Sequence, residues 1–184
     1  GLKNAIVSVH DVEDKAFIDG FKGTEVIAEF CQFLPFAGVV VNTKNFHVEN
    51  HDADPDDPKS TQGVLHNPHS FTVKGSSSAT GFNIGLAKKG DTLDKPVQFR
   101  GGADKVGYYR LQCDQHEFMQ SFFLPVANPY HAIVKEDGSF ELKGVPAGKH
   151  KVVVFHPFVG RGKLNEFEVE VTEGGTANLK ADLK

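Results

Sequence analysis

Sulfur-containing side chains are scarce in this sequence, and indole side chains are absent. Its 184 residues include two cysteines, one methionine and no tryptophan. Two cysteines are too few for the disulfide framework that stabilises many small secreted domains. A chain of this length can bury a core without such bridges. No apolar run approaches the length of a membrane-spanning helix, so we expect a soluble protein.

A charge excess of one sign is also missing. The chain carries 20 basic and 24 acidic residues, a formal net charge of −4, with both signs spread along its length. A nucleic-acid-binding protein would show a basic stripe instead. The glycine-rich motifs of nucleotide sites and the C-x-x-C-H motif of covalent haem do not occur. No Ser/His/Asp signature or pair of catalytic carboxylates stands out, so we do not expect an enzyme.

Turn-forming residues, by contrast, are abundant. Nineteen glycines and nine prolines separate short apolar runs, and some runs alternate, with Phe46 and Val48 on one face. No stretch longer than a turn or two has helical periodicity. This pattern of short apolar runs separated by turn-forming residues is typical of an all-β chain. The expected strands include Asn4–Val12, Thr24–Pro35, Gly38–Asn42, Phe46–Asn50, His69–Gly75 and Val106–Cys113.

The spacing of alternating runs and turn-forming residues becomes more regular after Asn128–Pro129. Asp137-Gly138 is a hairpin signal between alternating runs, and Gly174-Gly175 lies at the corner of a last expected pair. We therefore expect two packed β-sandwich units.

A polar loop, His51–Gly63, contains the acidic run Asp52–Asp57. The run lacks the glycine and the distal glutamate of an EF-hand loop. We expect a solvated acidic loop, which would attract a basic redox partner electrostatically.

The segment that carries chemistry has the spacing C-x2-H-x2-M, at Cys113, His116 and Met119. A thiolate, an imidazole and a thioether suit a soft, redox-active metal, and copper is the first candidate. A second histidine would complete the set of an electron-transfer copper site. His66 is the preferred candidate. His69 is its rival, but on one strand it would face the opposite side.

The pattern of residues around these candidates resembles the cupredoxin family of blue copper proteins. Its matching residues are Phe33, Pro35, Val48, Asn50, His66, Asn67, Tyr109, Leu111, Cys113, Asp114, His116 and Met119. With "CQFLP", "NPY" and "DGSFELKGVPAG", the chain is most similar to cupredoxin-like proteins of the methylamine-utilisation type. The tail resembles a carboxypeptidase-regulatory or transthyretin-like sandwich.

The resemblance implies a Greek-key cupredoxin-like sandwich or barrel at residues 20–128. It implies a second, smaller β-sandwich, built from residues 1–19 and 129–184. The expected function is that of a type 1 copper protein, which shuttles single electrons to a partner such as a c-type cytochrome. His66, Cys113, His116 and Met119 would be the ligands, with Asn67 bonded across to the Cys113 loop. An exported, periplasmic or extracellular location follows, and a first residue other than Met is compatible with it.

Cys31 leaves alternatives open. It is a free buried thiol, a second sulfur ligand, or the disulfide partner of Cys113. A module for binding, storing or delivering copper or zinc would use the same ligands without electron transfer. A structural β-sandwich protein would instead contain the Cys31–Cys113 disulfide.

Overall fold

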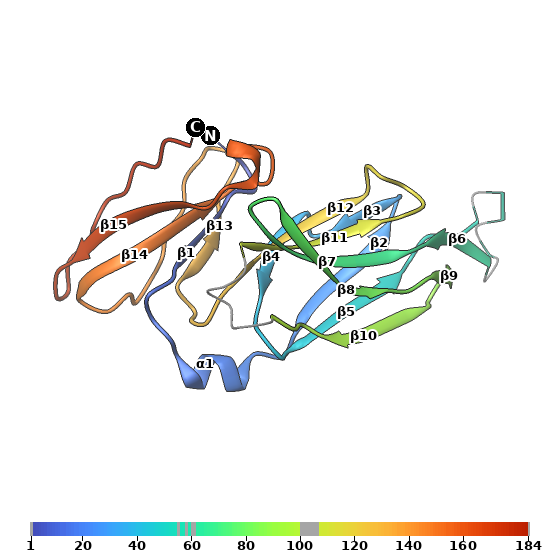
Figure 1. Ribbon diagram of the computed structural model, residues 1–184, viewed down its shortest axis with the longest axis horizontal. Coiled ribbons are helices and arrows are strands. Elements are labelled where there is room, and N and C mark those ends of the chain that lie inside the picture. Colours follow the sequence, from blue (N-terminus) through green and yellow to red (C-terminus); the bar gives the residue numbers. More distant parts are fainter. Residues whose placement is uncertain (1, 55, 58, 60–61, 100–106, 184) are drawn as a thin grey trace. The chain divides into compact units, whose positions relative to one another are not determined.

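A computed structural model describes residues 2–54, 56–57, 59, 62–99 and 107–183. The chain divides into two compact units (Figure 1). Unit 1 consists of Gly1–Phe21 and Val126–Lys184, and unit 2 of Lys22–Pro125. Strands dominate both units, so the predicted all-β class is confirmed. Within the described residues, no helix has the length and hydropathy needed to cross a membrane.

Unit 1 contains a four-stranded sheet in the order β13-β1-β14-β15. Because β1 pairs antiparallel with both β13 and β14, the N-terminal strand lies inside a sheet whose other strands come from the C-terminal part. The elements of this unit are β1 (Ile6–Val9), α1 (Lys15–Gly20), β13 (His131–Ile133), β14 (Gly148–Phe155), the 3-10 helix η2 (Gly160–Gly162) and β15 (Asn165–Val171). The short helix was not predicted; the side chain of Asp14 caps it by accepting the N–H of Phe17.

A buried amide joins the two ends of the chain within unit 1. The side chain of Asn128 donates to the carbonyl oxygens of Val9 and Val12, at 2.8 Å each. Its Oδ1 accepts the N–H of Tyr130 at 2.9 Å. Asn128 is fully buried, so these bonds are protected from water. They fix the N-terminal segment against the start of the C-terminal one.

Two segments expected as strands in unit 1 are not strands. The tight turn at Asp137-Gly138 is present, with Gly138 at φ 86°, but residues 139–147 and 172–183 form no ladder among the described residues. Their apolar side chains, including Phe140 and Leu179, still pack on the core of the sheet. Side-chain alternation therefore identified which residues pack inward, but it could not establish the backbone pairing.

Unit 2 is built from two main sheets and a small one. The orders are β10-β5-β2-β3, then β4-β12-β11-β7-β8, with β6-β9 as a separate pair. The strands are β2 (Thr24–Glu29), β3 (Gln32–Leu34), β4 (Ala37–Val40), β5 (Asn45–Asn50), β6 (Gln62–His66), β7 (Pro68–Lys74), β8 (Ser77–Asn83), β9 (Leu86–Lys88), β10 (Thr92–Pro96), β11 (Tyr108–Cys113) and β12 (Gln120–Pro125). Val106 and parts of the expected acidic loop lie outside the described residues.

One apolar cluster fills the space between the two main sheets. Phe46 and Val48 of β5 are both 0% exposed, as their alternation predicted. The ring of Phe46 lies 5.2 Å from that of Tyr109 and 5.1 Å from that of Phe123, which belong to the opposite sheet. The same cluster includes Cys113, so the end of β11 is anchored in the core. Unit 2 is therefore a β-sandwich with the candidate site at one end of its core.

The expected strand Thr24–Pro35 is in fact a hairpin. Its two-residue turn consists of Phe30 and Cys31, with φ values of 52° and 53°. Glycine or asparagine normally occupies such positions, because other side chains are strained there. The sequence therefore contains no turn signal at this point. The N–H groups of both residues are bonded to the carboxylate of Asp52, which is distant in the sequence.

Candidate metal centre

The C-x2-H-x2-M segment is a closed loop between β11 and β12. The N–H of Cys113 donates to the carbonyl of Met119 at 3.0 Å, and the N–H of Met119 donates to that of His116 at 2.9 Å. These bonds fold the loop back on itself. They leave the Cys113 sulfur 3.6 Å from Nδ1 of His116. The loop backbone thus places two of the predicted ligands together.

His66 comes to the same point from the end of β6. One potential ligand atom each from His66, Cys113 and His116 lies within 4.8 Å of the others. The two imidazole rings lie edge to face, with centroids 5.3 Å apart. His66 and Cys113 are 0% exposed, whereas His116 is partly exposed. Three of the four predicted ligands therefore converge, although they come from distant parts of the sequence.

The backbone of Asn67 links the two ligand segments. Its N–H donates to the sulfur of Cys113 at 3.3 Å, and its carbonyl accepts the N–H of Asp114 at 3.3 Å. The expected link through Asn67 is therefore present, but it is made by the main chain. It holds His66, the preceding residue, beside the Cys113 loop.

The remaining predicted ligand, Met119, has a buried side chain in the same apolar cluster as Cys113. The rival histidine, His69, is engaged elsewhere. Its Nδ1 lies 3.0 Å from the carboxylate of Asp114, and its Nε2 lies 3.1 Å from the hydroxyl of Thr80. Both ring nitrogens of His69 thus have protein partners, whereas Nδ1 of His66 is buried with no hydrogen-bond partner.

The surroundings of Cys113 favour a thiolate. Burial raises the pKa of its thiol, but nearby groups outweigh burial and lower the pKa to about 6. These groups are the imidazole of His66, the N–H groups of Asn67 and Gln115, and the imidazole of His116. A thiolate is the form of cysteine that binds metals. The site therefore favours the ligand form of Cys113 before any metal arrives.

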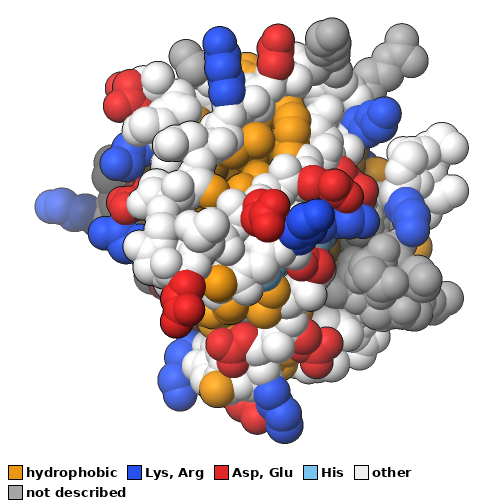
Figure 2. Space-filling model, turned by 90° about the vertical axis from the view of Figure 1, so that its left-hand side faces the viewer, with side chains coloured by type: hydrophobic (Ala, Val, Ile, Leu, Met, Phe, Trp, Pro, Cys, Tyr) orange, Lys and Arg blue, Asp and Glu red, His pale blue; other side chains and the backbone are white. Residues whose placement is uncertain are grey.

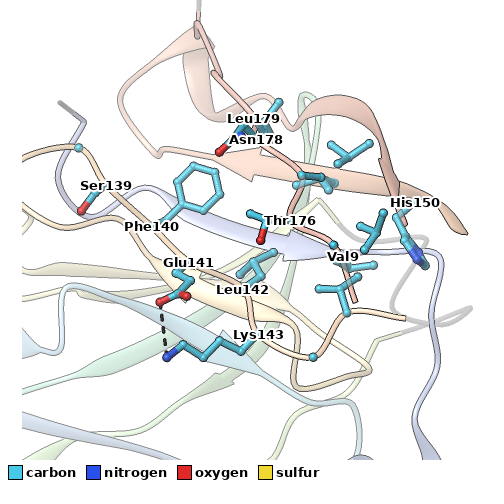
Figure 3. A pocket seen from close by; sticks show the side chains of 18 residues that line it. Val9, Ser139, Phe140, Glu141, Leu142, Lys143, His150, Thr176, Asn178 and Leu179 are labelled. Carbon is cyan, nitrogen blue, oxygen red and sulfur yellow. Dashed lines mark ion pairs between the residues drawn. The ribbon is translucent and has the colours of Figure 1, made fainter. Parts of the chain in front are cut away.

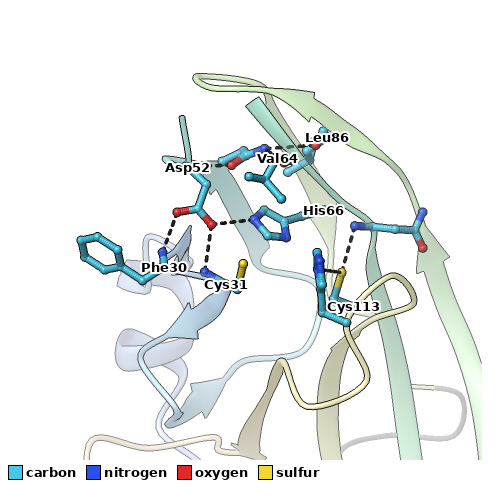
Figure 4. A network of polar contacts seen from close by, with 10 residues as sticks. Phe30, Cys31, Asp52, Val64, His66, Leu86 and Cys113 are labelled. Atoms are coloured by element: carbon cyan, nitrogen blue, oxygen red, sulfur yellow. Dashed lines mark hydrogen bonds and ion pairs between the residues drawn. The ribbon is translucent and has the colours of Figure 1, made fainter. Parts of the chain in front are cut away.

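Asp52 is a residue of this site that sequence reasoning missed. We expected it in a solvated loop, but it is 8% exposed, and one of its oxygens lies 2.7 Å from Nε2 of His66. The surrounding contacts are drawn in Figure 4. Burial raises the pKa of Asp52, but the N–H groups of Cys31 and Phe30 and the ring of His66 together lower it. The only available signal was its position two residues after Asn50, the last core-facing residue of β5.

Cys31 is near the site but is not bonded to Cys113. Both cysteines are free, so the structure contains no Cys31–Cys113 disulfide. Cys31 instead belongs to a second group of possible ligands, with Asp52 and His66, whose atoms also lie within 4.8 Å of one another. Burial and the nearby charges of Asp52 and Cys113 raise the pKa of the Cys31 thiol. The thiol of Cys31 is therefore held protonated more firmly than that of Cys113.

A cavity of about 570 Å³ lies in unit 1, within the region where the expected strands are missing. Figure 3 shows Phe140, Leu142 and Leu179 around it, with His150 at one side. Both ring nitrogens of His150 already have partners, the carbonyl of Pro146 at 2.8 Å and the carboxylate of Asp11 at 3.2 Å. The cavity is therefore lined by both apolar and polar side chains, and its one histidine has no free ring nitrogen.

Figure 2 views the molecule from the side of β14 and β15. Hydrophobic side chains are visible there, bordered by acidic and basic ones. Along β15 the acidic residues Glu166, Glu168 and Glu170 alternate with the side chains of the core face. This face carries charged side chains of both signs.

The types of donor that His66, Cys113 and His116 bring together fit a copper ion, and Met119 would add a fourth. The set of four combines two imidazoles, a thiol of lowered pKa and a thioether, which is the combination that soft, redox-active metals prefer. The buried, unpartnered Nδ1 of His66 is the strongest indication, because buried ring nitrogens normally have partners. A metal ion bound to Nδ1 would give this nitrogen the partner that it lacks.

No protein-family model and no curated protein matches the chain. Among solved structures, the chain is similar to a purple cupredoxin from Nitrosopumilus maritimus, with 16% identity and a TM-score of 0.40; the match covers 56% of this chain and 99% of the other. A mutant of amicyanin in the Cu(I) form has 14% identity and a TM-score of 0.37, over 65% and 98% of the two chains.

A copper-containing nitrite reductase from Thermus scotoductus SA-01 has 13% identity and a TM-score of 0.39. That match covers 58% of this chain but only 23% of the reductase, so the chain corresponds to about a quarter of that enzyme's length. These likenesses are remote, with identities of 13–16% and TM-scores of 0.37–0.40.

Proposed function

We propose that unit 2 binds one copper ion through His66, Cys113, His116 and Met119 and transfers single electrons. The observation that carries this proposal is the unpartnered, fully buried Nδ1 of His66, in a group with Cys113 and His116. Copper bound there would alternate between Cu(I) and Cu(II) and so carry one electron. The resemblance of the ligand segment to the cupredoxin family points the same way.

The chain's own residues would keep the ligands fixed. The Cys113 loop is closed by its backbone bonds, and Asn67 ties it to the His66 segment. The buried cluster around Cys113 and Met119 excludes water from one side of the site. A rigid, apolar surrounding limits rearrangement between oxidation states, and it also tunes the potential.

An electron would leave through the partly exposed edge of His116, the ligand nearest to solvent. Phe118, two residues further on, is 75% exposed, and its ring centroid lies 5.9 Å from that of His116. An exposed aromatic ring beside the exit suits a transient protein contact. The proposed partner is a redox protein such as a c-type cytochrome, in the periplasm or outside the cell.

A second candidate is a module that binds, stores or delivers copper or zinc without electron transfer. The observation that favours it is the additional group of donors, Cys31 and Asp52, beside His66. Extra donors next to a ligand suit the transfer of a metal from one protein to another. This candidate uses the same main ligands, so only redox behaviour separates the two.

The test is to add copper to the whole protein and record its optical spectrum, EPR spectrum and voltammogram. We expect one copper ion per chain, an intensely coloured Cu(II) form and a reversible one-electron wave. The Cys113→Ala variant should lose the colour, whereas Cys31→Ala should keep it. Tight copper uptake without a reversible wave would favour the storage module, and failure to take up copper would overturn both proposals.

A further inference from the structure

The carboxylate of Asp52 makes three contacts in the interior of unit 2. Its Oδ1 accepts the N–H of Phe30 at 2.6 Å, and its Oδ2 accepts the N–H of Cys31 at 2.9 Å. Nε2 of His66 lies 2.7 Å from the same Oδ2 (Figure 4). The Asp52 side chain is only 10% exposed, so little water competes with these contacts. Asp52 thus joins the β2–β3 turn to His66.

This contact determines which nitrogen of His66 carries the proton. An ionised carboxylate has no hydrogen to donate, so Nε2 must be the donor. In a neutral imidazole the other nitrogen, Nδ1, then has a free lone pair. Nδ1 is the buried atom with no protein partner, in the ring that faces Cys113 and His116. Asp52 therefore leaves the ligand atom of His66 free to bind.

Asp52 is itself held rigidly by Asn50. Oδ1 of Asn50 accepts the N–H of Asp52 at 3.0 Å. The amide of Asn50 donates to the carbonyls of Val64 at 2.9 Å and Leu86 at 3.1 Å, on the two strands of the β6-β9 pair. Asn50 is fully buried. The carboxylate is thus fixed relative to β6, the strand that delivers His66.

The same atoms offer an alternative, a second cation held by Cys31, Asp52 and His66. The contacts of Asp52 argue against it, because protein N–H groups already occupy its carboxylate. A cation would have to displace the proton of His66 and at least one of these bonds. A carboxylate that accepts from the far nitrogen of a metal-binding imidazole is a common arrangement around metal ligands.

We infer that Asp52 is a positioning residue: it sets Nδ1 of His66 toward Cys113 and His116 and strengthens that nitrogen as a metal donor. The metal part of this inference rests on the proposed function. A stronger imidazole donor favours the more highly charged Cu(II) form, so Asp52 lowers the reduction potential. Loss of such an outer contact typically weakens metal binding about 10–100-fold.

The first experiment needs no metal. The ¹⁵N resonances of the neutral His66 ring in the metal-free protein report which nitrogen carries hydrogen, and we expect the Nε2–H form. The spectra are recorded at alkaline pH, because burial lowers the pKa of this imidazole but contacts with Cys113 and Asp52 outweigh burial and raise the pKa. A predominant Nδ1–H form would overturn the inference. In Asp52→Asn the side-chain amide can donate to Nε2, so we expect the Nδ1–H form to increase. The matched control is Asp56→Asn, which removes one charge from an exposed position of the same loop and should leave the ring unchanged.

The second experiment uses the copper-loaded protein. In Asp52→Asn we expect Cu(II) affinity to fall about 10–100-fold and the potential to rise. A tenfold greater loss for Cu(II) than for Cu(I) corresponds to a rise of about 59 mV. Asp56→Asn should match the wild type. An unchanged affinity and potential in a folded Asp52→Asn variant would overturn the inference while leaving the electron-transfer proposal intact.

The two proposals can fail separately. If the protein takes up no copper, the proposed function fails, but the ring resonances still test whether Asp52 sets the tautomer of His66. Two metal ions per chain in the wild type, with one lost in both Cys31→Ala and Asp52→Asn, would overturn the positioning role. That result would establish the second cation site instead.

Discussion

The ionisation of Cys113 in the metal-free protein offers a quantitative check on the site. An ordinary cysteine has a pKa of 9.0, whereas that of Cys113 is lowered to about 6. Burial acts in the opposite direction, so the neighbouring donors must more than offset it. These are the His66 ring, the N–H groups of Asn67 and Gln115, and the His116 ring.

The size of the effect is large enough to measure without ambiguity. Three pKa units correspond to about 4 kcal/mol of preference for the thiolate, at roughly 1.4 kcal/mol per unit. At pH 7.5 the thiolate fraction of Cys113 should be about 97%, whereas that of an unperturbed thiol with the same reference value would be about 3%. Almost all molecules would then have the ligand form ready at neutral pH.

The assay is ultraviolet thiolate absorbance as a function of pH. It is performed on metal-free Cys31→Ser, so that Cys113 is the only thiol, and folding is monitored by circular dichroism. In the same background, His116→Gln should raise the midpoint, because one group that favours the thiolate is removed. The control is His47→Gln, since the ring of His47 pairs with Asp94 instead. A midpoint at 9 or above before the substitution would refute the reasoning, as burial would then outweigh the donors.

Three further predictions concern stability. Leu111→Ala leaves a cavity at a fully buried core position and should lower the unfolding free energy by about 2–5 kcal/mol in a urea titration. The control Leu65→Ala, at a 45% exposed position, should lower it much less. Equal losses would contradict the burial argument. Asn128→Ala removes the side-chain donor from the buried carbonyl of Val9 and the part-buried carbonyl of Val12 and should cost about 2–4 kcal/mol. A loss below about 1 kcal/mol in denaturant unfolding would mean that water replaces the amide. Burial lowers the pKa of His131 from its ordinary value of 6.5. The unfolded state therefore binds the proton first, and the unfolding free energy should fall as the pH drops below about 6.5. His131→Gln should flatten this decline, and an unchanged slope between pH 7.5 and 5 would refute the prediction.

The parts of the fold that were predictable are local. Alternation in β5 identified which side chains face the core, since successive residues of a strand point to opposite faces. The C-x2-H-x2-M spacing identified a closed loop, because its residues are neighbours along the chain. The turn at Asp137-Gly138 was likewise correctly expected from its residue types.

The parts that were missed depend on distant contacts. The Phe30–Cys31 turn has no glycine or asparagine, and its two N–H groups are satisfied by Asp52, more than 20 residues away. The acidic composition of the loop that begins at Asp52 suggested solvent, but this one carboxylate points inward. The strands expected at residues 139–147 and 172–183 are absent, because these segments contact the sheet through apolar side chains and not through a backbone ladder, whereas β15 of the last expected pair is present.

The residue types alone determined the class of the fold and the chemical character of the site. Periodicity depends on backbone geometry, and soft sulfur and imidazole donors have the same preferences wherever they occur. The sequence favoured His66 over His69, but only tertiary structure decided that Nδ1 of His66 is buried without a protein partner and that Asp52 contacts its other ring nitrogen. Those outcomes depend on which groups meet across the core, and contacts between segments far apart in sequence have no local signal.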